Sequence, residues 1–252
     1  MRFVRFRHRG VEHYGRLEGD RVVTLSEAPW GRPVDGPSVP LSDVELGVPT
    51  EPSKIVLVGV NYRQHAAEMG KALPEEPLIF TKPPSALNAH GRAIVLPPES
   101  REVHYEAELA LVVGRRLKGA TPAEAAQAVF GLLPFNDVTA RDIQRREVQF
   151  TRAKGFDTFA CVGPWVQTGL APDDLRITCR VNGETRQDDR TSDLVFDVST
   201  LVAFISRAMT LLPGDLISTG TPSGVGPLHP GDRVEVEVEG IGTLVNPVVM
   251  GT

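Results

Sequence analysis

The sequence has little cysteine and no long apolar segment. Its 252 residues include only two cysteines, Cys161 and Cys179, too few for a disulfide framework or a zinc site. Each lies in an apolar run, which predicts a buried free thiol and a cytoplasmic protein. No apolar run approaches the length of a membrane span, and the first residues lack the pattern of a signal peptide. We therefore expect no membrane partner.

An excess of positive charge is also lacking. The chain has 32 acidic and 27 basic residues, which gives a net charge of −5. A surface that binds nucleic acid needs a basic field to attract phosphate groups. The composition therefore argues against a nucleic-acid partner.

Glycine and proline, by contrast, are plentiful. The 24 glycines and 21 prolines favour many turns and short strands over a helical bundle. We expect a mainly β fold with short helices, divided into a small N-terminal β domain over residues 1–50 and a larger domain over residues 51–252. In the first part, alternation over residues 2–8, 11–17 and 21–25 predicts a three-stranded meander. The proline-rich residues 30–52 predict a linker or an extended segment that wraps around the protein.

Hydrophobic patterning predicts the main elements of the larger domain. Strands are expected at residues 54–60, 78–81, 104–114, 216–219, 233–239 and 243–249, and helices at residues 61–70, 121–128 and 199–209. Thr121 and Glu124 form a capping box at the start of the second helix. Thr139 is expected to cap a short helix, and residues 151–158 are expected to form a loop.

The predicted strand over residues 104–114 separates its side chains by parity. One face is apolar, whereas the opposite face begins with His104, Glu106 and Glu108. Two glutamates at positions i and i+2 of a strand repel each other unless a cation lies between them. The alternative is a half-exposed strand that presents both glutamates to water. This segment alone leaves both interpretations open.

Other polar residues add candidate site groups, each with a simpler alternative. Asp137 follows an apolar run, and three oxygen ligands without histidine or cysteine would suit Mg²⁺, Mn²⁺ or Ca²⁺. His65 and Glu68 share a helix face and could be a base with its orienting carboxylate, or an ordinary surface pair. Lys154 and Arg141 could neutralise a substrate carboxylate or face solvent. The Gly-rich residues 219–226 could bind an anion or form a tight turn.

Several motifs occur in the order of a known family. They are residues 59–68 (GVNYRQHAAE), 82–85 (KPPS), 105–109 (YEAEL), 136–142 (NDVTARD), 154–158 (KGFDT), 181–184 (VNGE) and 219–224 (TGTPSG). From about residue 54 to its end, the chain resembles the fumarylacetoacetate hydrolase superfamily. The N-terminal meander resembles the small leading domain of bacterial stand-alone members. The resemblance implies a mixed β-sandwich roll, a homodimer, and a divalent cation, Mg²⁺ or else Mn²⁺ or Ca²⁺, in the mouth of the roll.

The resemblance also implies roles for individual residues. The metal ligands would be Glu106, Glu108 and Asp137. The catalytic residues would be His65 and Glu68 on a helix that covers the substrate, and Lys154 beside the metal. The substrate-binding residues would be Tyr62, Arg141, Gln144, Gly220 and Thr221. Asn61 departs from the pattern of the enzyme that names the superfamily, which has a metal-binding aspartate there, so fumarylacetoacetate is not the expected substrate.

The implied chemistry is the formation of an enolate from a 2-oxo or 2-hydroxydienoic acid that chelates the metal. Proton return at another carbon gives isomerisation, loss of a carboxylate gives decarboxylation, and attack by water gives C–C hydrolysis. The N-terminal domain and residues 238–245 resemble 2-hydroxyhepta-2,4-diene-1,7-dioate isomerases of aromatic catabolism, which we favour. Residues 151–157 look more like acylpyruvate hydrolases and oxaloacetate decarboxylases. A homologue that lost activity and only binds a metal or ligand is a further alternative.

Overall fold

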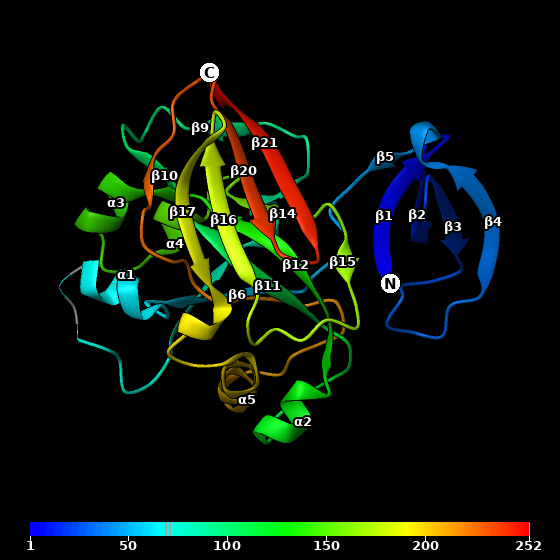
Figure 1. Cartoon of the computed structure of the whole chain (residues 1–252), viewed down its shortest axis with the longest axis horizontal. Helices are drawn as coiled ribbons and strands as arrows, with labels where there is room; N and C mark the ends of the chain where they lie inside the picture. The colour runs from blue at the N-terminus through cyan, green and yellow to red at the C-terminus, as the bar shows by residue number, and fades with distance from the viewer. Residues whose placement is uncertain (69, 71, 252) are drawn as a thin grey trace.

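The computed structural model describes residues 1–251 except residues 69 and 71. Its strands form three sheets, and Figure 1 shows the N-terminal strands as a lobe beside the main body. The largest sheet has 13 strands, and its principal order is β4-β3-β2-β1-β15-β12-β11-β18-β6-β7. The other two sheets have the orders β13-β10-β19 and β17-β16-β20-β21-β9. The predicted class, mainly β with short helices, is confirmed.

The strands of the largest sheet are β1 (Arg2–His8), β2 (Val11–Glu18), β3 (Arg21–Leu25), β4 (Asp35–Pro40), β5 (Glu45–Leu46), β6 (Ile55–Gly59), β7 (Leu78–Lys82), β8 (Leu87–Ala89), β11 (Ala107–Val113), β12 (Val129–Asp137), β14 (Ala160–Val162), β15 (Val166–Gln167) and β18 (Leu216–Ser218). The three-stranded sheet contains β10 (Val103–Tyr105), β13 (Thr139–Ala140) and β19 (Gly226–Pro227). The five-stranded sheet contains β9 (Ile94–Leu96), β16 (Arg176–Val181), β17 (Glu184–Arg190), β20 (Arg233–Val238) and β21 (Gly242–Met250).

The helices are short, as the sequence predicts. They are α1 (Arg63–Glu68), α2 (Pro122–Ala126), α3 (Arg141–Arg146), α4 (Thr151–Lys154) and α5 (Val198–Ala208), with 3₁₀ turns at Leu41–Asp43, Pro84–Ala86 and Thr191–Asp193. The predicted capping box of Thr121 and Glu124 starts α2. The predicted helix over residues 61–70 is α1, and its residue 69 lies outside the described residues. Within the described ranges, no helix has the length and apolar character needed to span a bilayer.

Residues 30–52, predicted to be a linker or an extended wrap, contain two strands, so the linker interpretation was wrong. Residues 35–40 form β4, which pairs with β3 through Val22 and Val39, and β5 pairs with β1. Prolines are tolerated in β4 because it is an edge strand, where one side makes no ladder hydrogen bonds. The lobe encloses a small core of Val4, Phe6 and Val22, and β1 also pairs with β15.

The single strand predicted over residues 104–114 is in fact two strands. The strand is interrupted at Glu106. Before it, β10 pairs with β13 and β19; after it, β11 pairs with β12 and β18. In β11 the predicted parity holds: Leu109 and Leu111 face one apolar core, and Ala110 and Val112 face another. Both faces of β11 are therefore buried, and Glu106 lies at the corner between two sheets.

Two smaller predictions also needed correction. Residues 151–154 of the predicted loop form α4, which brings Lys154 into the protein interior. Thr139 does not cap α3, because the capping position is Ala140 and the Thr139 hydroxyl donates to the carbonyl of Asp137. Both cysteines are free and buried, as predicted.

Candidate active site

The carboxylates of Glu106, Glu108 and Asp137 meet where β11 begins and β12 ends. One oxygen from each lies within 4.8 Å of the others, and we call these three residues the metal cluster. The antiparallel register places Ala107 opposite Asn136, and the Asp137 N–H donates to the Glu106 carbonyl at 2.9 Å. Glu106 and Glu108 are only 5% and 2% exposed. The interpretation of both glutamates as a half-exposed strand face is therefore wrong.

Two cations from α3 and α4 bind the Glu106 side of the cluster. Lys154 Nζ donates to Glu106 Oε2 at 2.9 Å and also to Asp137 Oδ2, and Arg141 pairs with Glu106 Oε1. Burial alone would raise the pKa of Glu106, but Lys154 and Arg141 hold it well below its usual range. Burial would lower the pKa of Lys154, but Asp137 and Glu106 raise it above its ordinary value. Both groups are therefore charged in the folded protein.

A second lysine, Lys82, lies behind Asp137; burial lowers the pKa of its amino group, and the charge of Asp137 opposes that effect. Its side chain has no exposed surface, its Nζ pairs with Asp137 Oδ1, and it donates to the carbonyl of Val138 at 3.0 Å and to that of Phe159. The sequence contains Lys82 in a family motif, but we had assigned no role to it. A lysine at the end of an apolar strand and before two prolines was the only available signal.

Glu108 is bound differently, because its hydrogen-bond donors among the described residues are neutral. Its Oε2 accepts hydrogen bonds from the Ser218 hydroxyl and from the Gly220 N–H, the latter at 3.0 Å. Burial raises the pKa of Glu108 well above its ordinary value, and the negative charges of Asp137 and Glu106 raise it further. The Gly-rich segment thus directs an N–H group at a carboxylate of the protein itself.

This raised pKa predicts how pH affects the metal-free protein. The stabilising contribution of protonated Glu108 is complete below its ordinary pKa, and it is lost as pH rises through the raised pKa of the folded state. In EDTA, the free energy of unfolding of the wild type relative to Glu108→Gln should fall by up to about 1.4 kcal/mol per pH unit in that window. Chemical denaturation at a series of pH values measures this difference, and a difference independent of pH would contradict the expectation.

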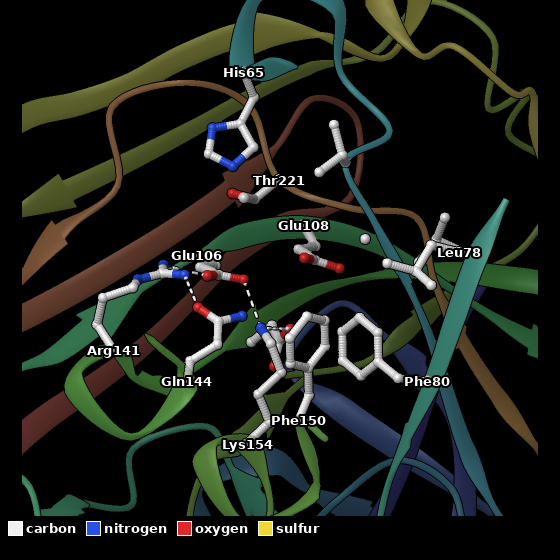
Figure 2. Close-up of a pocket in the computed structure, with 14 residues that line it drawn as sticks. His65, Leu78, Phe80, Glu106, Glu108, Arg141, Gln144, Phe150, Lys154 and Thr221 are labelled. Carbon is white, nitrogen blue, oxygen red and sulfur yellow. Dashed lines mark hydrogen bonds and ion pairs between the residues drawn. The ribbon is translucent and has the colours of Figure 1, made fainter. Parts of the chain in front are cut away.

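His65 covers the cluster from α1. Its Nδ1 lies 3.0 Å from Glu68 Oε2, and Glu68 also accepts the Gly224 N–H at 3.3 Å. Because a carboxylate only accepts hydrogen bonds, Nδ1 carries the proton and Nε2 is free to act as a base. Figure 2 shows the ring directed at Thr221 and at the carboxylates below it. His65 and Glu68 are therefore in contact beside the cluster, and their roles as base and orienting carboxylate stay a prediction.

A pocket connects the predicted residues. Its wall includes His65, Glu106, Glu108, Asp137, Arg141, Gln144, Lys154 and Thr221. On the other side lie three apolar residues that we had not predicted, Leu78, Phe80 and Phe150. The rings of Phe80 and Phe150 meet edge to face at 5.4 Å.

Tyr62, predicted to bind the substrate, is not part of this pocket wall. It is completely buried and belongs to the main apolar core. Burial raises the pKa of its hydroxyl, and the charge of Glu108 adds to that effect. Gly220 is not part of the wall either, and it acts through its N–H on Glu108. The structure therefore supports an indirect role for Gly220 and a packing role for Tyr62.

The side chain of Asn61 forms hydrogen bonds with backbone groups. Its side-chain amide donates to the carbonyls of Thr219 at 2.8 Å and Phe196 at 3.1 Å, and its oxygen accepts the Phe196 N–H at 2.9 Å. Asn61→Asp would place a carboxylate against two carbonyl oxygens and should lower the free energy of unfolding by ~3 kcal/mol. Urea denaturation measures the loss. An aspartate that instead kept full stability and strengthened metal binding would show that this position can supply a ligand.

The cluster fits a divalent cation. Three buried carboxylates offer only oxygen, which Mg²⁺, Mn²⁺ and Ca²⁺ accept, and no histidine or cysteine joins them among the described residues. The charge crowding that raises the pKa of Glu108 is what a cation would relieve. Lys154 bridges Glu106 and Asp137 and shows that their oxygens can share one positive group.

Comparison with known proteins agrees with this geometry. Residues 54–249 match the family described as fumarylacetoacetate (FAA) hydrolase, C-terminal. The chain belongs to the fumarylacetoacetate hydrolase family. Residues 1–49 match a family described as Rv2993c-like, N-terminal. The resemblance predicted from the motifs is confirmed, and members of this family are enzymes.

Two related proteins align with most of the chain. Protein Rv2993c of Mycobacterium tuberculosis is 50% identical over 229 residues, which span 89% of this chain and 86% of that protein. The mitochondrial oxaloacetate tautomerase FAHD2A of Bos taurus is 42% identical over 226 residues, which span 84% of this chain and 72% of that protein.

Solved structures share the whole fold. The 2-hydroxyhepta-2,4-diene-1,7-dioate isomerase of Mycobacterium marinum has a TM-score of 0.93 and 44% identity, with 99% of this chain and 98% of that chain covered. The maleylpyruvate hydrolase of Sphingobium sp. SYK-6, in complex with manganese(II) and pyruvate, has a TM-score of 0.83 and 31% identity, with both chains fully covered.

Proposed function

We propose that this protein is a divalent-metal-dependent isomerase of a 2-oxo or 2-hydroxydienoic acid, of the 2-hydroxyhepta-2,4-diene-1,7-dioate isomerase type. The observation that carries the proposal is the buried metal cluster at the floor of a pocket, with the free ring nitrogen of His65 above it. The names of the Mycobacterium marinum structure and of the bovine relative both describe isomerisation.

Glu106, Glu108 and Asp137 would hold the cation, Mg²⁺ or Mn²⁺. When bound, it supplies Lewis-acid charge for the carboxylate and 2-oxo oxygens of the substrate. Residues of the protein would supply the other chemical functions. Lys154, charged and 2% exposed, adds positive charge where an enolate oxygen develops.

Proton transfer falls to His65. With its Nδ1 proton held by Glu68, Nε2 can take a proton from the substrate carbon and return it to another carbon. Arg141 and Gln144 lie on the same wall and would orient the substrate, with the Thr221 hydroxyl opposite. The Gly224 N–H holds Glu68 in place at 3.3 Å, so that the ring stays aimed into the pocket.

Hydrolysis of a C–C bond in an acylpyruvate is the second candidate. The same His65 nitrogen could activate a water, and the manganese and pyruvate complex of maleylpyruvate hydrolase belongs to a protein of the same fold. The two reactions share the enolate and differ in whether water or a proton reacts next.

A substrate panel tests the proposal. We would assay 2-hydroxyhepta-2,4-diene-1,7-dioate, oxaloacetate and acylpyruvates with Mg²⁺, and follow exchange of the C3 protons in D₂O by NMR. Proton exchange and isomerisation without C–C cleavage are expected. Cleavage products would favour the hydrolase or decarboxylase, and no exchange with any compound would favour an inactive homologue. A homodimer remains a prediction, which sedimentation velocity would test.

A further inference from the structure

In two carboxylates of the metal cluster, groups other than Lys154 bind one oxygen, and among the described residues the second oxygen has either no such donor or Lys154 alone. Glu108 uses Oε2 for the Ser218 hydroxyl and the Gly220 N–H, so Oε1 is its remaining oxygen. Glu106 uses Oε1 for Arg141, and its Oε2 faces Lys154. Each glutamate therefore offers the cluster a single oxygen.

Lys82 imposes the same arrangement on Asp137. Its ammonium pairs with Oδ1, while Oδ2 faces Lys154. Lys82 is 1% exposed, and its other donors are directed at the carbonyls of Val138, at 3.0 Å, and Phe159. These acceptors belong to the backbone around the ends of β12 and β14, so the ammonium is held in place from three sides. Asp137 cannot turn both oxygens toward a cation while this ammonium occupies one of them.

The number of oxygens offered distinguishes divalent cations. Ca²⁺ takes roughly six to eight oxygens and often binds carboxylates through both oxygens, whereas Mg²⁺ requires a compact set of about six. Three carboxylates that each present one oxygen suit the smaller cation and leave positions for water and substrate.

We propose that Lys82 is a positioning residue that holds Asp137 Oδ1 and leaves only Oδ2 on the side of Lys154 for a cation, and that it thereby makes the site prefer Mg²⁺ or Mn²⁺ over Ca²⁺. This rests on the proposed function, since it assumes that the cluster binds a divalent cation. Lys82 does not line the pocket, unlike Lys154, so it acts through Asp137 and not on the substrate.

The test is the ratio of two affinities. MgCl₂ and CaCl₂ are titrated calorimetrically into metal-free wild type and into Lys82→Met. The wild type should bind Mg²⁺ more tightly than Ca²⁺, and in Lys82→Met this preference should fall by about tenfold or more. A general structural defect would weaken both cations alike and leave the ratio unchanged, so the ratio isolates the positioning role.

Lys54→Met is the matched control. Lys54 forms an ion pair with the buried Asp215 at the start of β6, and neither residue belongs to the pocket wall. Its loss should reduce stability but leave the preference for Mg²⁺ over Ca²⁺ as in the wild type. Lys82→Gln provides a second, polar variant if Lys82→Met does not fold.

Each outcome decides a distinct point. A ratio in Lys82→Met or Lys82→Gln equal to that of the wild type overturns the role of Lys82 alone. A wild type that binds Ca²⁺ as tightly as Mg²⁺ overturns it without any variant. A wild type that binds neither cation overturns the metal centre of the proposed function together with this inference.

Discussion

Glu108→Gln should remove the response of the protein to divalent cations and lower kcat/KM by about a thousandfold or more. The amide keeps an acceptor for the Ser218 hydroxyl and the Gly220 N–H but removes one of three negative charges that bind the cation. Because the carboxylate of Glu108 is crowded by Asp137 and Glu106, the metal-free variant should be at least as stable as the wild type. Thermal melting with and without Mg²⁺ and steady-state kinetics measure the two effects.

Glu235→Gln is the control for this prediction. Glu235 lies on β20 and pairs with Arg180 and Arg233, away from the pocket wall. Its loss should leave both the metal response and kcat/KM near wild-type values. If Glu108→Gln retained a normal rise in melting temperature with Mg²⁺, Glu108 would not be a metal ligand.

His65→Ala should lower kcat for isomerisation by about 10²–10⁴-fold while leaving metal binding intact. His65 lies outside the metal cluster and contributes a proton-transfer group, so the cation and an enolate mimic such as oxalate should still bind. Decarboxylation of oxaloacetate, which needs no base at this position, should be affected less. Single-turnover kinetics and calorimetric titration separate the two functions.

His104 provides the matched histidine variant. It lies on β10, its Nε2 is 3.0 Å from a Glu102 oxygen, and it does not line the pocket. His104→Gln should therefore keep full activity. A similar loss in both histidine variants, or loss of metal binding in His65→Ala, would contradict the assignment of His65 as the base.

Local patterns in the sequence predicted much of the fold. The capping box at Thr121 and the alternation of Leu109 and Leu111 depend on neighbours within a few residues, and both appear in the structure. The pairing of β4 with β3 depends on contacts across the lobe, so the proline-rich segment resembled a linker. The interruption of the strand at Glu106 also depends on distant contacts. The residues before and after Glu106 pair with strands of two different sheets, which the local pattern does not reveal.

For the candidate site, too, the sequence identified residues through local motifs but did not reveal contacts between distant segments. The order of the family motifs identified Glu106, Glu108 and Asp137, and the structure brings them together. Lys82 could not be assigned, because its burial depends on contacts with Asp137, Val138 and Phe159, which are distant in the sequence. The resemblance implied that Tyr62 binds the substrate, yet its side chain lies in the core. Motifs identified residue types, and tertiary packing decided which side chains reach the pocket.

The most direct test of the metal centre is an anomalous difference map. Crystals grown with Mn²⁺ and oxalate would be measured at a wavelength where manganese scatters anomalously. We expect a strong peak among the oxygens of Glu106, Glu108 and Asp137, with oxalate bound to the metal beside Lys154 and below His65. Full occupancy of manganese elsewhere, with no peak at these carboxylates, would contradict the account.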